Sequence, residues 1–122
     1  MNIIFGEAVN TIPDNYTTLE LDTVRIEGTD TKTTFYCLVE NIPLEEFPLL
    51  ENNKENHAML MENYKNQNWD YCAKLIPFLL GKFSGELDSF YNTLSQRIEK
   101  LKNESLADNW DGSVEASARG IK

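Results

Sequence analysis

The sequence predicts an α+β fold in which a short strand and a β-hairpin are followed by three helices. Three observations support this prediction. Strand-like runs rich in β-branched residues flank a turn within residues 1–40. Prolines interrupt residues 41–54. Apolar side chains then recur at helical spacing up to about residue 102. We expect these parts to form one compact unit.

The composition restricts the function. The chain has 122 residues, of which 41% are hydrophobic and 11% aromatic, enough for one folded domain with a modest core. Its net charge of −9 would repel nucleic acid and anionic membrane surfaces, so neither is expected as a partner. No signal-peptide pattern is present, and no apolar run approaches the ~18 residues of a membrane span. A cytoplasmic location is expected, and with it buried, reduced thiols at Cys37 and Cys72.

Residues 1–40 are predicted to form a small β-rich subdomain. Residues 3–5 are β-branched and aromatic, which favours a strand. Residues 7–12 are expected to form a brief helix that ends before Pro13, because the residue before a proline is biased away from helical geometry.

The best strand in the chain is residues 33–40, which is predicted to pair with residues 17–27 as a hairpin closed by a turn at residues 28–32. Within residues 17–27 the alternation of apolar and polar residues slips by one position between Leu21 and Val24. A β-bulge at this point would return Val24 to the face that carries Leu21.

Residues 41–54 are interpreted as a proline-punctuated linker and residues 55–113 as a helical segment with a tryptophan tail anchor. The helical pattern itself starts slightly earlier, and three helices are expected: residues 51–65, 69–79 and 86–102. Pro77 is expected to kink or restart the second of them. The polar residues 114–122 are predicted to form an irregular, flexible tail.

No constellation of catalytic residues is found, so no catalytic site, cofactor or metal is predicted. Residues 81–83, Gly-Lys-Phe, lack the upstream glycine and the Ser or Thr of a phosphate-binding loop. His57 is the single histidine and has no second metal ligand close to it in the sequence. The adjacent Glu45 and Glu46 are interpreted as solvated charges.

The stretch ADNWDGSVEA, residues 107–116, suggests either a calcium loop or a turn. If Gly112 is the sixth position of such a loop, the first and twelfth are Ala107 and Ala118, whose side chains cannot bind calcium. Asp-Gly is instead a strong turn signal, because glycine tolerates positive φ. Trp110 in this polar stretch is expected to lie against an apolar surface.

The first forty residues resemble the C-terminal end of class III nucleotidyl cyclase catalytic domains. The segments IIFGEAV, PDNYTTLELDTVRIEG and KTTFYCLVEN carry the resemblance. The family typically shows a Leu-Asp-x-Val-x-Val-Lys-Gly strand, a turn and a final strand of the Val-Tyr-Glu-Leu type. The matching residues here are Leu21, Asp22, Val24, Arg25, Ile26, Gly28, Phe35, Tyr36, Leu38 and Glu40, and Glu27 stands in place of the lysine.

The rest of the chain is similar to a helical appendage that follows this strand in many bacterial cyclases. That appendage is tetratricopeptide-like and ends in a Trp-Asp-Gly tail. The segments MENYKNQNWDYCAKLIPFLLGK, GELDSFYNTLSQRI and DNWDG occur in the same order. The resemblance implies a role in helix packing or as a tail anchor for Tyr64, Trp69, Ala73 and Trp110. The pattern also resembles small proteins of marine tailed phages.

The family's metal-binding aspartates, purine-recognising residues and transition-state Asn and Arg all precede the strand at residues 3–5, so none has a position here. The leading hypothesis is therefore a non-enzymatic protein-interaction or adaptor module that binds a protein partner or self-associates through a helical groove or a sheet edge. The alternative is a C-terminal fragment of a nucleotidyl cyclase that lacks its active site. A small enzyme that uses His57 or a cluster of glutamates is a third hypothesis, without a supporting constellation.

Overall fold

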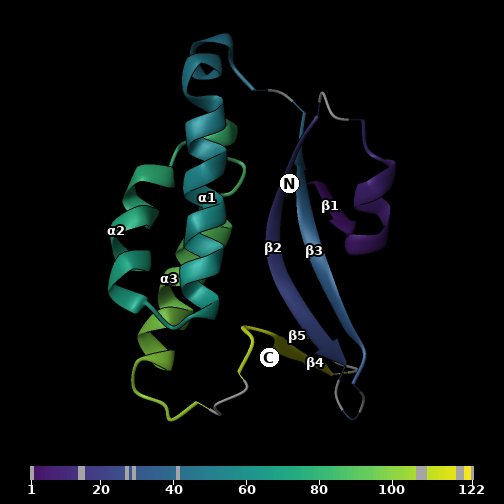
Figure 1. Ribbon diagram of the computed structural model, residues 1–122, viewed down its shortest axis with the longest axis vertical. Coiled ribbons are helices and arrows are strands. Elements are labelled where there is room, and N and C mark those ends of the chain that lie inside the picture. Colours follow the sequence, from purple (N-terminus) through teal and green to yellow (C-terminus); the bar gives the residue numbers. More distant parts are fainter. Residues whose placement is uncertain are drawn as a thin grey trace.

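The protein is an α+β structure in which a mixed β-sheet is covered on one face by three helices (Figure 1). The computed structural model describes residues 2–13, 16–26, 28, 30–40, 42–106, 110–117 and 120–121. The main strands precede the helices along the chain, so the predicted fold class is confirmed.

Within the described residues the sheet has five strands in the order β1-β3-β2-β4-β5. The strands are β1 (Asn2–Phe5), β2 (Thr17–Ile26), β3 (Lys32–Val39), β4 (Val114–Ser117) and β5 (Gly120–Ile121). Neighbouring strands are antiparallel, except that β4 runs parallel to β2. A 3-10 helix, η1 (Gly6–Thr11), follows β1, and lies on the far side of the sheet from the helices (Figure 1).

The predicted hairpin and its bulge are both present. β2 and β3 are antiparallel, and their register shifts between Glu20 and Thr23. The shift keeps Leu19, Leu21 and Val24 buried on the face that packs against the helices. The extra residue therefore resolves the slip in the apolar pattern, because a bulge restores the side-chain face after an odd spacing.

The helical layer consists of α1 (Leu50–Lys65), α2 (Trp69–Leu79) and α3 (Asp88–Leu101). Two 3-10 turns, η2 (Leu44–Leu49) and η3 (Phe83–Gly85), lie before α1 and after α2. The predicted linker boundary at residue 54 is wrong, since α1 already begins at Leu50. Pro48 lies inside η2, where its fixed φ suits a helical turn and its missing N–H costs little.

The predicted irregular tail is also corrected, because residues 114–117 and 120–121 form strands. β4 pairs with β2 along Val24–Ile26. Polar composition alone suggested disorder, but strand pairing uses backbone groups and depends on a free sheet edge rather than on apolar side chains. Only the long-range placement of the tail beside β2 decides this outcome.

The core lies between the sheet and the helices. It contains Leu19, Leu21, Cys37, Val39, Leu60, Met61, Tyr64, Cys72, Leu75, Ile76, Leu79, Phe83, Leu87, Phe90, Tyr91, Leu94 and Ile98. The two thiols are buried and free, and burial raises the pKa of both Cys37 and Cys72 to about 11. Within the described ranges, no helix has the length and apolar character needed to cross a membrane.

Candidate functional site

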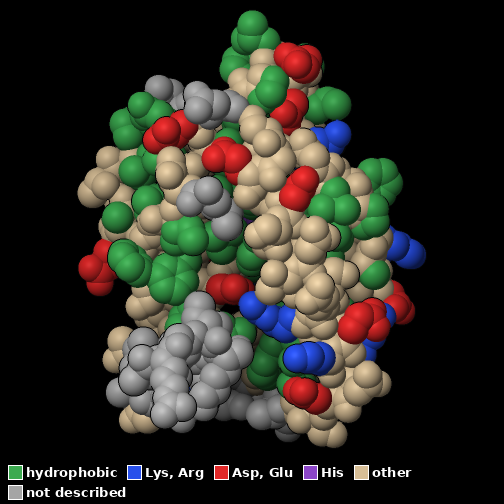
Figure 2. Space-filling view, turned by 180° about the vertical axis from the view of Figure 1, so that it is seen from behind, with side chains coloured by type: hydrophobic (Ala, Val, Ile, Leu, Met, Phe, Trp, Pro, Cys, Tyr) green, Lys and Arg blue, Asp and Glu red, His purple; other side chains and the backbone are tan. Residues whose placement is uncertain are grey.

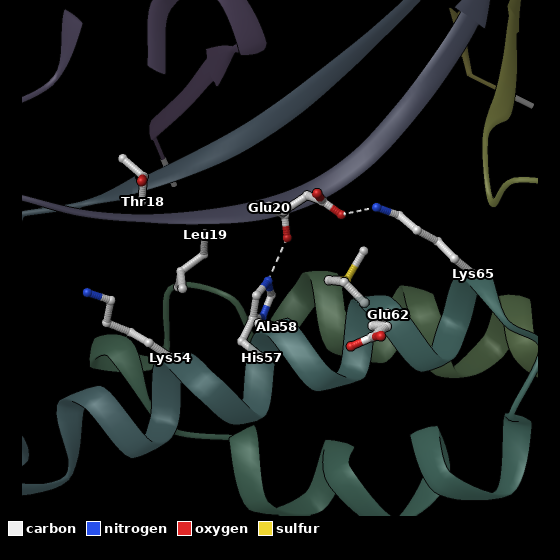
Figure 3. Close-up of a pocket in the computed structure, with 9 residues that line it drawn as sticks. Thr18, Leu19, Glu20, Lys54, His57, Ala58, Glu62 and Lys65 are labelled. Carbon is white, nitrogen blue, oxygen red and sulfur yellow. Dashed lines mark hydrogen bonds and ion pairs between the residues drawn. The ribbon is translucent and has the colours of Figure 1, made fainter. Parts of the chain in front are cut away.

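A hollow lies between the edge of β2 and the side of α1, and is called here the β2–α1 groove (Figure 3). Its cavity volume is about 320 Å³. The lining residues are Thr18, Leu19, Glu20, Lys54, His57, Ala58, Met61, Glu62 and Lys65. Leu19, Ala58 and Met61 provide apolar surface, and charged side chains surround them. The groove can therefore accept an apolar group while polar atoms remain near its mouth.

His57 connects the two walls of the groove. Its Nε2 is 2.6 Å from the carbonyl oxygen of Glu20 in β2, and its Nδ1 is 2.8 Å from the hydroxyl of Tyr91 in α3. The side chain is 2% exposed, with the rings of Phe83 and Phe90 also beside it. One histidine thereby holds α1, α3 and β2 together.

The partners of His57 determine its tautomer. A carbonyl oxygen can only accept, so Nε2 carries the proton and donates to Glu20. The neutral ring then accepts at Nδ1 from the Tyr91 hydroxyl. Burial lowers the pKa of His57, which favours this neutral form. Both nitrogens are engaged, so His57 has a structural role and does not act as a free base toward the groove.

The two lysines at the mouth of the groove form ion pairs within the protein. Lys65 donates to the carboxylate of Glu20 at 2.8 Å, an ion pair visible in Figure 3. Lys54 lies 3.3 Å from the carboxylate of Glu51, one turn earlier on α1. An anionic ligand would have to compete with Glu51 and Glu20 for these lysines. The groove therefore favours an uncharged group over an anionic one.

Three aromatic rings form a second cluster, the tail anchor, made of Tyr64, Trp69 and Trp110. The ring centroids of Tyr64 and Trp110 are 5.5 Å apart, those of Trp69 and Trp110 are 5.8 Å apart, and those of Tyr64 and Trp69 are 5.8 Å apart. All three pairs are edge-to-face, the arrangement that aromatic quadrupoles prefer. Ala73, the fourth residue that the resemblance suggested, is exposed on α2 and makes no described contact with the cluster.

The residues after Trp110 form a turn, as the Asp-Gly pair at residues 111–112 predicted. The Ser113 backbone N–H donates to the Asp111 carboxylate at 3.0 Å, and Lys32 of β3 forms an ion pair with the same carboxylate. These two partners hold the pKa of Asp111 well below its usual range. Gly112 has φ +85° and packs against the Tyr64 ring. Asn109, which the resemblance placed in the anchored stretch, lies outside the described residues.

Glu46 has a role that sequence reasoning missed. Its carboxylate accepts hydrogen bonds from the backbone N–H groups of Phe83 at 2.8 Å and Ser84 at 3.3 Å. Phe83 and Ser84 both have positive φ, 53° and 59°, so successive N–H groups converge on one anion. The interpretation of Glu46 as a solvated charge is therefore wrong. No local signal could have linked two segments 37 residues apart.

A partly buried ion pair joins α3 to the sheet. Arg97 contacts both carboxylate oxygens of Asp22, at 2.7 and 3.3 Å, and the two side chains are only 20% and 16% exposed. Within the described residues the neighbouring Tyr64 hydroxyl is buried without a hydrogen bond of good geometry. Burial raises the Tyr64 pKa, and the nearby Arg97 guanidinium opposes that rise.

Among the residues that the structure describes, no three His, Cys, Asp or Glu side chains are placed to hold a metal ion. The structure thus brings together three of the four residues suggested for the tail anchor and adds the β2–α1 groove, which no sequence motif indicated. No family model, curated protein or solved structure matches the chain, so the proposals below rest on its geometry and sequence.

Proposed function

We propose that this chain is a non-enzymatic protein-interaction or adaptor module. The observation that carries the proposal is the number of large apolar side chains left more than half exposed. They are Ile3 (56%), Phe5 (60%), Leu44 (77%), Phe47 (53%), Leu49 (55%) and Phe78 (70%). Single exposed apolar residues are ordinary, but groups of them on one element are typical of surfaces that a partner covers.

Two such groups lie within the part of the chain that the structure describes. Leu44, Phe47 and Leu49 all belong to η2, at the upper end of the molecule, where Figure 2 also shows hydrophobic side chains at the surface. Ile3 and Phe5 belong to β1, an outer strand of the sheet. β1 contains no charged residue and no proline, the features with which proteins usually protect an exposed edge. A protein partner or a second copy of the chain would cover either surface.

The test compares partner capture and self-association between surface variants. Phe47→Asp removes apolar surface from η2, and Ile3→Lys does so from β1. Each is compared with Asn52→Asp, which introduces a charge at another exposed position. We expect an interaction, either a captured partner or a dimer detected by native mass spectrometry, that at least one surface variant abolishes and the control preserves. Interactions equally strong in all variants, or absent from the wild type, would contradict the proposal.

The second candidate is a C-terminal segment of a nucleotidyl cyclase that lacks the active site. The observation that favours it is the outer edge of β1, which pairs with no described strand. In a longer protein the rest of a catalytic sheet would continue from this edge. Reading the gene upstream of Met1 tests this candidate. An in-frame extension that encodes paired aspartates would support it, and an in-frame stop codon would exclude it.

A further inference from the structure

The edge of β2 that faces the β2–α1 groove is only partly paired. β4 covers this edge along Val24–Ile26, and no described strand covers it between Thr18 and Glu20. The carbonyl of Glu20 points to this edge, where it accepts from His57. Backbone groups of alternate residues in a strand point to the same side. The N–H and C=O of Thr18 are therefore inferred to face the open edge as well, where no described strand pairs with them.

The groove runs directly beneath this open edge. Its apolar lining comes from Leu19 on the sheet and Ala58 on α1, both labelled in Figure 3, and from Met61, also on α1. A second cavity of about 290 Å³ shares Thr18 and Lys54 with the groove and extends it toward the loop before β2. The remaining residues of that second cavity are Val9, Ile12, Pro13 and Tyr16.

The length of the groove suits a short extended segment. Lys54 and Lys65 mark its two ends on α1 and are separated by 11 positions in the sequence. At 1.5 Å per helical residue this is about 16 Å, the length of roughly five residues in a β-strand. Because the lysines are already paired with Glu51 and Glu20, the groove favours apolar side chains over negatively charged ones.

We propose that the β2–α1 groove binds an extended, largely uncharged segment of a partner protein by strand addition. The segment continues along β2 in line with β4 and forms backbone hydrogen bonds to Thr18. Alternate side chains of the segment enter the groove over Leu19, Ala58 and Met61. Strand addition beside a helix gives affinity through the backbone and specificity through the alternate side chains. The inference deepens the proposed interaction function and rests on it.

Continuity with β4 is the main support for this choice of occupant. The protein already adds one extended segment, β4, to the same edge of the same strand. The residues that precede β4 do not continue along the edge of β2. Gly112 packs on Tyr64 instead, and Trp110 lies against the helices. The position alongside Thr18 is thus the continuation of an existing outer strand, and no described strand fills it.

The test uses random linear peptides displayed on phage and selected against the full chain. The affinity of a selected synthetic peptide is measured for the wild type, Ala58→Arg and Asn52→Arg. Both sites are exposed on α1 and gain the same charge, and arginine is a good helix former. Ala58→Arg fills the groove and should weaken binding about tenfold or more, the loss expected when one apolar side chain can no longer be buried. Asn52→Arg should bind as the wild type does.

Amide hydrogen exchange supplies a second measurement that does not depend on any variant. A bound peptide should slow exchange at Thr18, whose N–H faces the open edge, more than at α2. Peptides that bind Ala58→Arg and the wild type equally would overturn the groove proposal, as would selection of no binding peptide. If peptides that bind Ala58→Arg as well as the wild type fail to bind Phe47→Asp, the groove proposal fails while the proposed interaction function stands.

Discussion

His57 on α1 donates a hydrogen bond from Nε2 to the carbonyl oxygen of Glu20 on β2 at 2.6 Å, and accepts another at Nδ1 from Tyr91 on α3. Three elements are thereby joined through one neutral imidazole. Protonation of His57 would place a second N–H toward the Tyr91 hydroxyl, in a site with little access to water. The neutral state of His57 is therefore part of the folded structure.

This arrangement predicts a specific dependence of stability on pH. Burial lowers the pKa of folded His57 below 6.5, so the unfolded chain binds more protons between the two pKa values. The stabilisation is fully present above the unfolded pKa and is lost as pH falls through the folded one. Each pKa unit between the folded and the unfolded state corresponds to about 1.4 kcal/mol of unfolding free energy.

Urea unfolding of the wild type and of His57→Gln, followed over about pH 5–8 where an unperturbed histidine titrates, checks this prediction. Glutamine can still donate a hydrogen bond but does not titrate. We expect the unfolding free energy of the wild type to fall more steeply toward low pH than that of the variant. Parallel curves would show that His57 does not change its proton affinity on folding.

Trp110 should stabilise the protein although it follows a polar segment. Its ring contacts both Tyr64 and Trp69. Because the ring is only partly buried, Trp110→Ala should cost about 1–3 kcal/mol, below the roughly 3–5 kcal/mol typical of a full aromatic truncation in a core. The melting temperature should then fall by several degrees, since about 1 kcal/mol corresponds to roughly 2–8 °C. Thermal unfolding measures the difference.

Tyr71→Ala is a suitable control for that measurement, because Tyr71 is an aromatic residue of α2 that is 41% exposed. Its truncation should change the melting temperature much less. A position in β4, such as Glu115, is a poorer control because β4 itself pairs with β2. If Trp110→Ala and Tyr71→Ala change the melting temperature equally, the tail anchor adds no stability of its own.

Gly112 and Gly28 provide a matched pair that separates backbone strain from crowding. Their φ angles are +85° and +81°. A Cβ at Gly112 would lie 3.1 Å from Lys65 Cγ and 3.5 Å from Tyr64 Cε1, whereas a Cβ at Gly28 would meet no atom within 4 Å. Both alanine variants should lose about 1–2 kcal/mol from left-handed geometry, and Gly112→Ala should lose more. Denaturant titration compares them, and a larger loss at Gly28 would contradict the packing of the tail on Tyr64.

Cys37 and Cys72 should react slowly with a charged thiol reagent while the protein is folded. Both side chains are 0% exposed, and the raised pKa of each thiol leaves little thiolate at neutral pH. Labelling followed by mass spectrometry in buffer and in denaturant measures the protection. Reaction of either thiol in buffer at its denatured rate would mean that the core opens readily at that cysteine.

The local elements could be predicted from the amino-acid pattern. The spacing of apolar residues indicated the β2–β3 hairpin, the bulge after Leu21 and the three helices to within a few residues. These features depend on side chains that lie near one another in the sequence, so periodicity and turn chemistry are sufficient to predict them.

Contacts between residues far apart in the sequence could be seen only in the folded protein. Lys32 and Asp111 are 79 positions apart, Arg97 and Asp22 are 75 apart, and the His57–Glu20 contact spans 37. The pairing of β4 with β2 and the groove beside Thr18 arise in the same way. No local pattern encodes such contacts, because each depends on how the whole chain packs a sheet against helices. The candidate binding surface belongs to this second class, so it became visible only in three dimensions.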